Sequence, residues 1–291
     1  MKSLHNVPAP AKLNLFLHIT GRQSDGYHLL QSVFMLVDWC DTLHFDVRDD
    51  GRITRKDLTN TLPAEDLTVK AARALQAFSG THLGVDIQIS KSIPAEAGMG
   101  GGSSDAASCL LALNRLWNLQ LSRADLMQIG IKLGADVPFF LSGTNAWVEG
   151  IGEQIQAIDI PTAHFLVLKP AAGLSTQAIF SHRELKRDTE TAIISGFLAH
   201  PFGFGRNDLQ AVAQKLCPDV NLALTWLKTK GLQPRMTGSG SAVFAHVGSD
   251  KLSQFVDSAK NLTAGLSDAP GNAVIKLCSN LAEHPLKSWA N

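Results

Sequence analysis

The sequence is poor in cysteine and has no excess of charge of either sign. Its 291 residues include four cysteines, none in a Cys-x-x-Cys pair, so neither a zinc site nor a dense disulfide framework is suggested and a reducing compartment fits best. Lysine plus arginine and aspartate plus glutamate both number 26, so no net positive field attracts nucleic acid or an anionic membrane. We therefore expect no nucleic-acid partner and no membrane partner.

Long hydrophobic runs are also missing. No run approaches the roughly 20 apolar residues that cross a bilayer. Polar residues interrupt the short apolar stretch near the N-terminus, and no small-residue cleavage pattern follows it. We expect a cytoplasmic protein. Hydrophobic residues make up 45% of the chain and charged residues 18%, which is typical of a globular protein with one large or two medium domains.

The first half of the chain is predicted to begin with strands. Residues 12–19 alternate between two faces, as in a half-buried strand, so Lys12 and Asn14 share one face. Strands are expected at 33–37 and 42–47, around a turn at Cys40 and Asp41. The remaining elements predicted in this half are a helix at 65–78, a strand at 85–90, and helices at 103–117 and from Ser122 to Leu133.

A domain boundary is predicted near Pro161, because a new apolar strand begins just after it, at 165–168. The predicted domains are residues 1–160 and 161–291. The second domain is expected to contain helices at 208–216, 221–230 and 251–262 and strands at 235–237, 242–247 and 273–277. This mixture favours an α+β fold.

The most informative segment places four glycines immediately before the strongest helix. Glycine lets the backbone approach a ligand closely. Backbone amides and the positive end of the helix can then bind an anion such as a triphosphate, although a flexible surface loop is the competing interpretation. The candidate ATP-binding residues are Pro94, Ala95, Glu96, Ala97, Gly98, Met99, Gly100, Gly101, Gly102, Ser103 and Ser104.

Other glycine motifs fit this segment less well. The sequence contains no Gly-x-x-x-x-Gly-Lys-Ser/Thr motif, and Ser103 stands where a dinucleotide-binding fingerprint needs its third glycine. It also contains no Gly-x-Ser-x-Gly motif, so a serine hydrolase is not indicated.

Several motifs in order resemble those of the GHMP kinases, the superfamily of galactose, homoserine, mevalonate and phosphomevalonate kinases. They lie at residues 10–15, 22–28, 98–107, 133–139, 207–209 and 237–240. The resemblance implies a two-domain GHMP kinase fold, with a ribosomal-protein S5 domain 2-like N-terminal domain and a ferredoxin-like C-terminal domain. It also implies ATP as phosphoryl donor, Mg²⁺, and a small alcohol bound in the cleft between the domains.

The resemblance assigns the catalytic base to Asp136 and its partner to Lys12. The sequence around Asp136 supports this role, since the residue lies between Gly134 and Pro138 in an apolar segment, where a carboxylate without a function is not expected. An ordinary helix N-cap is the alternative for Asp136, and a solvated surface lysine is the alternative for Lys12. A carboxylate that accepts the proton of the substrate hydroxyl contributes about 10²–10⁴-fold to the rate.

The resemblance is strongest to members that phosphorylate the 2-hydroxyl of a cytidine diphosphate conjugate of methylerythritol. It implies that Tyr27 and Phe180 stack on the cytosine and that His28 hydrogen-bonds to it, while Asn14 and Thr176 match further substrate contacts. Without the resemblance, Phe180 would be interpreted as a core residue. The alternatives are another GHMP kinase, for mevalonate or homoserine, and a non-catalytic ATP-binding regulator.

Two positions depart from the family pattern, and two motifs have structural interpretations. Glu96 brings a negative charge into the phosphate loop, and Asp66 stands where relatives often have asparagine near the adenine. The turn at 237–241 matches the superfamily's third motif, and residues 207–209 are expected to cap the helix that they open. The sequence does not indicate a magnesium ligand, and we expect a monomer or weak homodimer.

Overall fold

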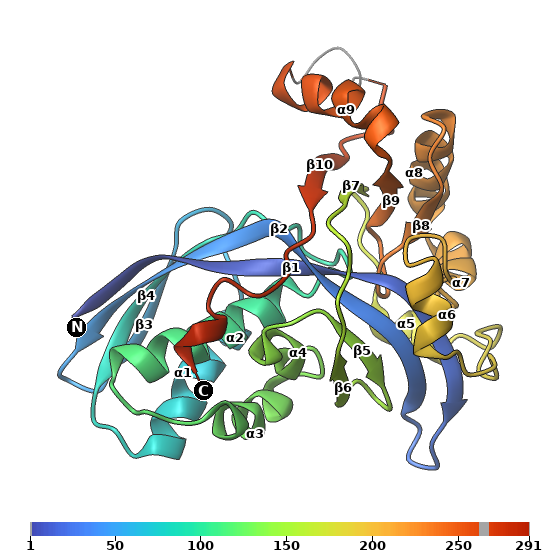
Figure 1. Ribbon diagram of the computed structural model, residues 1–291. Coiled ribbons are helices and arrows are strands. Elements are labelled where there is room, and N and C mark those ends of the chain that lie inside the picture. Colours follow the sequence, from blue (N-terminus) through green and yellow to red (C-terminus); the bar gives the residue numbers. More distant parts are fainter. Residues whose placement is uncertain (1, 262–267, 291) are drawn as a thin grey trace.

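Two long strands, β1 (Ser3–Arg22) and β2 (His28–Arg48), cross the molecule and connect its two halves (Figure 1). They belong to a computed structural model in which residues 2–261 and 268–290 are described. The two strands pair antiparallel, with four register shifts along their length. Such irregularities bend strands, so one continuous ribbon can contribute to both halves of the fold.

The turn predicted at Cys40 and Asp41 is wrong, because β2 passes through both residues. Asp41 is fully buried, and its carboxylate accepts hydrogen bonds from the backbone N–H groups of Ser92 and Ile93. A polar residue that would otherwise end a buried strand is thus satisfied by the neighbouring loop.

The first sheet has six strands. Five of them follow the order β3-β4-β2-β5-β6, with β4 and β5 on the same side of the long strand β2. The sixth, β1, pairs with the other side of β2. All pairs are antiparallel except the parallel pair of β3 and β4. The additional strands are β3 (Ile53–Asp57), β4 (Gly84–Ser90), β5 (Ala146–Glu149) and β6 (Gln154–Ala157).

Four helices gather on one face of this sheet (Figure 1). They are α1 (Leu67–Ser79), α2 (Gly101–Leu116), α3 (Arg123–Leu133) and α4 (Val137–Ser142). The predicted stop of α1 at Gly80 is confirmed by a left-handed backbone there, and the capping box at Ser122 and Asp125 is formed. The sequence pattern missed α4, β3, β5 and β6, which are short.

The second sheet has the order β10-β7-β9-β8. Its strands are β7 (His164–Lys169), β8 (Pro234–Met236), β9 (Val243–Val247) and β10 (Val274–Ser279), and its helices are α7 (Gln210–Leu216), α8 (Pro218–Thr229) and α9 (Ser249–Asn261). This β-α-β-β-α-β sequence confirms the ferredoxin-like expectation. Each predicted element of this half is present, although the predicted end of the last helix, at Leu262, lies outside the described residues.

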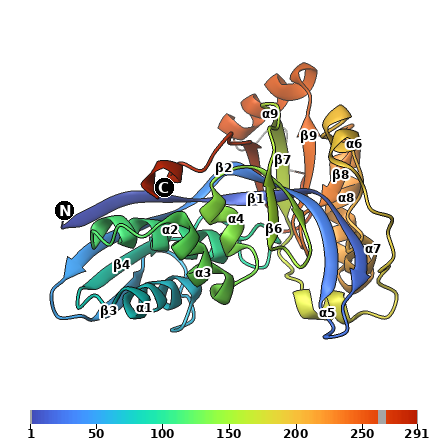
Figure 2. The same cartoon turned by 60° about the horizontal axis from the view of Figure 1, so that its bottom comes forward.

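The short helices α5 (Thr176–Ser181) and α6 (Ile194–Ala199) lie between β7 and α7 in the chain and were not predicted. The chain then ends on the first half, where the 3-10 helix η1 (Lys287–Trp289) follows Leu286 (Figure 2). Leu286 and Ala290 join the core of the first sheet and its helices. The predicted division at 160/161 falls between the two sheets, and it stays a prediction.

Candidate active site

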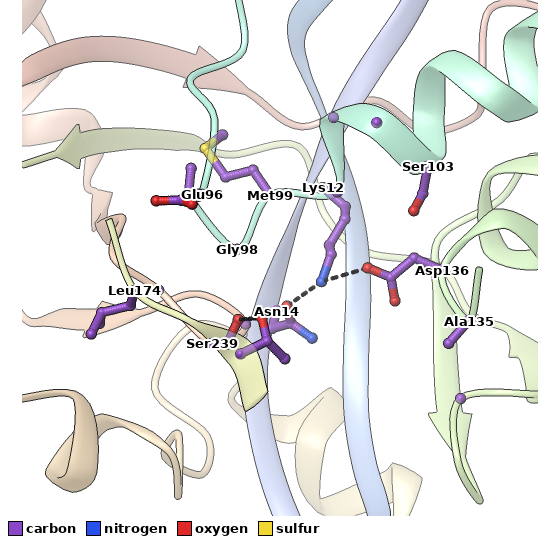
Figure 3. A pocket seen from close by; sticks show the side chains of 18 of the residues that line it. Lys12, Asn14, Glu96, Gly98, Met99, Ser103, Ala135, Asp136, Leu174 and Ser239 are labelled. Atoms are coloured by element: carbon purple, nitrogen blue, oxygen red, sulfur yellow. Dashed lines mark hydrogen bonds and ion pairs between the residues drawn. The ribbon is translucent and has the colours of Figure 1, made fainter. Parts of the chain in front are cut away.

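A cleft of about 1390 Å³ lies where the two halves meet. Its walls come from β1, from the glycine loop before α2, from the start of α4, and from segments 174–180 and 238–240 of the second half. Figure 3 shows Lys12 and Asn14 on the strand, with the glycine loop on one side and Asp136 on the other. Most of the residues predicted to form the site therefore face one space.

Lys12 and Asp136 form an ion pair in this cleft. The Lys12 Nζ atom lies 3.4 Å from Oδ2 of Asp136, and the lysine side chain is only 5% exposed, whereas that of Asp136 is 31% exposed. Asp136 occupies the N-cap position of α4, but its side chain makes no capping bond. The carboxylate is consequently directed to Lys12 and to the cleft, and neither the N-cap nor the surface-lysine interpretation describes this pair.

Buried polar groups hold Lys12 in place from behind. Its Nζ atom donates to Oδ1 of Asn14 at 2.6 Å, which confirms that the two residues share a face, and lies 4.5 Å from the centre of the Phe34 ring. Asn14 Nδ2 donates to the hydroxyl of Ser32 at 2.9 Å, and that hydroxyl donates to the carbonyl of Phe16. The strand was expected to be half-buried, but residues 11–19 are buried throughout.

The order of these bonds fixes the orientation of the Asn14 amide. A serine hydroxyl has a single hydrogen. Since the hydrogen of Ser32 goes to the Phe16 carbonyl, Ser32 must accept from the Asn14 NH₂ group. The carbonyl oxygen of Asn14 is then left for the Lys12 ammonium. Ser32 was not singled out from the sequence, because its partners become visible only with the register of β1 and β2.

The glycine loop packs against both β1 and the second half. The backbone N–H of Lys12 donates to the carbonyl of Met99, and those of Ser241 and Ala242 donate to the carbonyls of Glu96 and Ala97. These carbonyls are therefore used inside the protein. The first N–H groups of a helix have no partner within it, and residues 98–103, which include the start of α2, line the cleft.

Two of the loop glycines are required by space as well as by backbone conformation. Gly98 has φ 70°, and a Cβ atom there would lie 2.3 Å from the carbonyl oxygen of Thr237. Gly100 has φ 72°, and a Cβ atom there would lie 3.0 Å from the Phe140 ring and 3.3 Å from Cγ of Lys12. Side chains at either position would separate the loop from the residues that it must contact.

The two serines after the loop differ. Ser103 lines the cleft on the same side as Asp136 (Figure 3). Ser104 is fully buried, its hydroxyl donates to the carbonyl of Pro10, and its N–H donates to Gly100, so the structure does not bring it to the cleft surface. Helix α2 begins at Gly101, two residues before the predicted start, and neither serine caps it.

Glu96 is exposed and points away from Lys12 and Asp136 (Figure 3). Its carboxylate lies against Gly173, where an added Cβ atom would come within 1.7 Å of Oε2. The charge of Glu96 also acts on buried Lys169: burial lowers the pKa of that lysine, and Glu96 opposes this effect. Its negative charge is thus directed to the second half of the molecule.

The residues predicted to bind the cytosine lie in the part of the cleft away from Lys12 and Asp136. Tyr27 is 62% exposed in the loop between β1 and β2, and the rings of His28 and Phe180 have centroids 5.1 Å apart. All three line the cleft together with Thr176, whose hydroxyl lies 2.7 Å from that of Ser239. The structure therefore brings the His28 and Phe180 rings together and Thr176 to the third-motif turn, and Tyr27 lines the same cleft.

A buried charge cluster next to the loop was missed by the sequence analysis. Lys91 forms ion pairs with both Asp41 and Asp105, and Asp105 lies in the first turns of α2. Burial raises the pKa of Asp105 to about 7; Lys91 opposes the rise and Asp41 adds to it. Burial disfavours the charge of Lys91, but the two carboxylates raise its pKa overall. A carboxylate inside an apolar helix was the available signal.

Residues 207–209 open α7 as expected, since Leu209 is its N-cap residue and its N–H donates to Oδ1 of Asn207 at 2.9 Å, but no side chain bonds to the first turn of the helix. The Asn207 amide donates to the carbonyls of Met236 and Gly238, both at 2.8 Å, and so supports the third-motif turn. Asp208 accepts from the N–H of Ile19 and from the hydroxyl of Thr189. Asp66, by contrast, caps α1 and pairs with Arg55 at 2.6 Å, which accounts for its charge.

Within residues 2–261 and 268–290, no three His, Cys, Asp or Glu side chains are grouped to hold a metal. No helix in the described part of the chain is long and apolar enough to cross a membrane. The oxygen ligands that line the cleft near the glycine loop include the Ser103 hydroxyl and the carboxylates of Asp105 and Asp136. Magnesium commonly needs few protein ligands, since it keeps waters and binds phosphate oxygens, so this donor set fits it.

Comparisons with known proteins agree with these features. The GHMP kinases N terminal domain matches residues 66–144. A 4-diphosphocytidyl-2-C-methyl-D-erythritol kinase of Polaromonas naphthalenivorans is 61% identical, over 99% of this chain and 97% of its own. The protein of the same name from Albidiferax ferrireducens is 63% identical, over 100% and 96%.

Solved structures give the same result. A crystal structure of 4-(cytidine 5'-diphospho)-2C-methyl-D-erythritol kinase has a TM-score of 0.76 at 31% identity, covering 93% of this chain and 98% of its own. A homoserine kinase from Cytophaga hutchinsonii has a TM-score of 0.71 at 16% identity, covering 98% and 96%, and supports the fold alone. The chain belongs to the 4-diphosphocytidyl-2-C-methyl-D-erythritol kinases of the GHMP kinase superfamily.

Proposed function

We propose that this kinase transfers the γ-phosphoryl group of ATP to the 2-hydroxyl of 4-diphosphocytidyl-2-C-methyl-D-erythritol, in the non-mevalonate route to isoprenoids. The names of full-length relatives supply the substrate. The observation that carries the mechanism is the Lys12–Asp136 pair, 3.4 Å apart at the mouth of the glycine loop. A polyphosphate and an acceptor alcohol can meet at this point of the cleft.

The polyphosphate of ATP binds to the loop amides between Gly98 and Ser103 and to the first turn of α2. Those amides and the positive end of the helix attract the phosphate oxygens. Glu96 is directed away from this position, so it does not repel the phosphates at short range. The nucleotide is thereby oriented with its terminal phosphate toward Lys12.

Asp136 accepts the proton of the 2-hydroxyl while the oxygen attacks the γ-phosphorus and ADP leaves. Lys12, paired with the Asp136 carboxylate, balances the negative charge that spreads over the transferring group. The Asn14 carbonyl and the Phe34 ring hold the ammonium in the cleft. Burial of Lys12 makes its charge more effective than a solvated charge would be.

Ser103, whose hydroxyl lines the cleft beside the glycine loop, would help to hold Mg²⁺, and the ion would supply positive charge against the phosphates of bound ATP. The cytosine would stack between Tyr27 and Phe180, with His28 contacting its polar edge and Thr176 contacting the substrate beyond it. A cytoplasmic location and a monomer or weak homodimer are part of the same proposal.

The aromatic set at the far end of the cleft distinguishes the proposal from a kinase for mevalonate or homoserine. Those acceptors have no nucleobase to stack, so Tyr27 and Phe180 would be unused. The Lys12–Asp136 pair disfavours a non-catalytic ATP-binding regulator, which needs no group to remove a proton.

The proposal is tested by measuring ADP release with ATP and a panel of alcohols. We expect 4-diphosphocytidyl-2-C-methyl-D-erythritol to give turnover far above that with mevalonate or homoserine. Equal rates with all three alcohols would refute the assigned substrate. Tight ATP binding without turnover on any of them would favour the regulator.

A further inference from the structure

The guanidinium of Arg187 lies behind the His28 ring and ties it to the segment that carries Phe180. Arg187 Nε donates to Nε2 of His28 at 2.9 Å, across 159 residues of sequence. Its other nitrogens donate to the carbonyls of Leu185, Phe180 and His182, at 2.9, 3.1 and 2.9 Å. Four hydrogen bonds thus hold one side chain between the two residues that face the base.

This arrangement determines which nitrogen of His28 carries a proton. An arginine has only donors, so the Nε2 atom that meets Arg187 must be the acceptor. A neutral imidazole has one N–H, which is then on Nδ1. Among the described residues, none is hydrogen-bonded to Nδ1, and His28 lines the cleft. The ring therefore offers the substrate a donor.

The surroundings also keep His28 neutral. Burial lowers its pKa, and the positive charges of Arg187 and Arg22 lower it further. A second proton on Nε2 would face the guanidinium directly and lose the hydrogen bond. The donor at Nδ1 is consequently a neutral N–H with a fixed partner on the other side of the ring.

We propose that Arg187 is a specificity-determining positioning residue, which makes His28 a donor at Nδ1 and so selects cytosine over uracil. The N3 atom of cytosine is an acceptor and matches this donor, whereas N3 of uracil carries a hydrogen and would oppose it. A site that leaves a polar group unpaired against the wrong ligand discriminates strongly. This inference rests on the proposed cytidine substrate.

The kinetic test compares the cytidine substrate with its uridine analogue in four proteins. The wild type should prefer the cytidine compound by about 100-fold or more in kcat/KM. Arg187→Met removes the donor, so either tautomer can form, and the preference should fall roughly tenfold, mainly through KM for the cytidine compound. Arg187→Lys keeps a donor and should retain most of the preference. Arg52→Met, which removes an exposed guanidinium far from the cleft, should change nothing.

Nitrogen-15 NMR of His28 in the ligand-free protein supplies a readout that does not depend on turnover. The wild type should show a protonated Nδ1 and an unprotonated Nε2, and Arg187→Met should show a mixture. A wild-type proton on Nε2 would overturn the inference, as would equal losses for the cytidine and uridine compounds in Arg187→Met. If the wild type shows the expected tautomer but does not phosphorylate the cytidine compound, the proposed substrate is refuted and the tautomer assignment stands.

Discussion

The two ends of the cleft are built differently. At the catalytic end, Lys12 and Asn14 lie on β1 and are 4% and 1% exposed, within a hydrogen-bonded network. At the cytosine-binding end, Tyr27 is 62% exposed in a connecting loop and Phe180 lies on α5, a helix of six residues. The residues that hold and balance the catalytic aspartate lie on a buried strand, whereas Tyr27 and Phe180 lie on a loop and on a short helix between larger elements.

The difference in construction suggests a difference in the kinetic parameter that each end controls. A catalytic group must be held close to the productive geometry, which buried strands and hydrogen bonds provide. A stacking surface tolerates more movement, because any position over the base retains contact. Substitutions at the catalytic end should therefore lower kcat, and substitutions at the cytosine-binding end should raise KM for the substrate.

The largest effect is expected for Asp136→Asn. The amide keeps the shape of the side chain but cannot accept the proton, so kcat should fall by about 10²–10⁴-fold. Calorimetric titration should show little change in affinity for ATP. Asp159→Asn, which alters an exposed aspartate outside the cleft, is the control and should behave as wild type. A near-normal kcat in Asp136→Asn would remove this residue from its role.

Tyr27→Ala should give the next largest effect. Stacking of a base on an aromatic ring contributes about 1–3 kcal/mol, so KM for the substrate should rise by roughly 10–100-fold while KM for ATP stays constant. The turn itself should persist, because its bond to Asp25 comes from the Tyr27 backbone. Tyr27→Phe keeps the ring and should be close to wild type. Equal increases in both KM values would contradict stacking.

Ser32→Ala should give the smallest effect of the three, and it sharpens the comparison. Without the hydroxyl, the Asn14 amide loses its fixed orientation, and Lys12 with it, so kcat should fall about tenfold or less at unchanged KM. Ser108→Ala is a matched control, since Ser108 also donates from a buried position to a β1 carbonyl, that of Pro8 at 2.9 Å. Loss of stability without loss of kcat in Ser32→Ala would make Ser32 purely structural.

The sequence predicted those parts of the candidate site that depend on residues close together in the chain, such as the glycine loop and the face of β1. Glycines at 98 and 100 are needed for a left-handed backbone and close contacts, and both requirements leave a sequence signal. The alternation of β1 placed Lys12 and Asn14 on one face. The resemblance carried by the ordered motifs predicted the GHMP kinase fold and the aromatic residues at the cytosine-binding end of the cleft.

The features that the sequence did not predict depend on pairing between distant segments. Asp41 remains inside β2 only because Lys91 and the backbone after β4 satisfy its carboxylate. The bond between Arg187 and His28 spans 159 residues, and no periodicity records it. Ser104 was assigned to ATP as part of the glycine-rich segment, but its hydroxyl donates to the carbonyl of Pro10.

A crystal structure with 4-diphosphocytidyl-2-C-methyl-D-erythritol and a non-hydrolysable ATP analogue tests the account most directly. We predict that the acceptor 2-hydroxyl lies within about 3 Å of the Asp136 carboxylate, the distance that proton transfer requires. The triphosphate should contact the amides of residues 98–103. A nucleotide bound elsewhere, or a hydroxyl beyond hydrogen-bonding reach of Asp136, would contradict it.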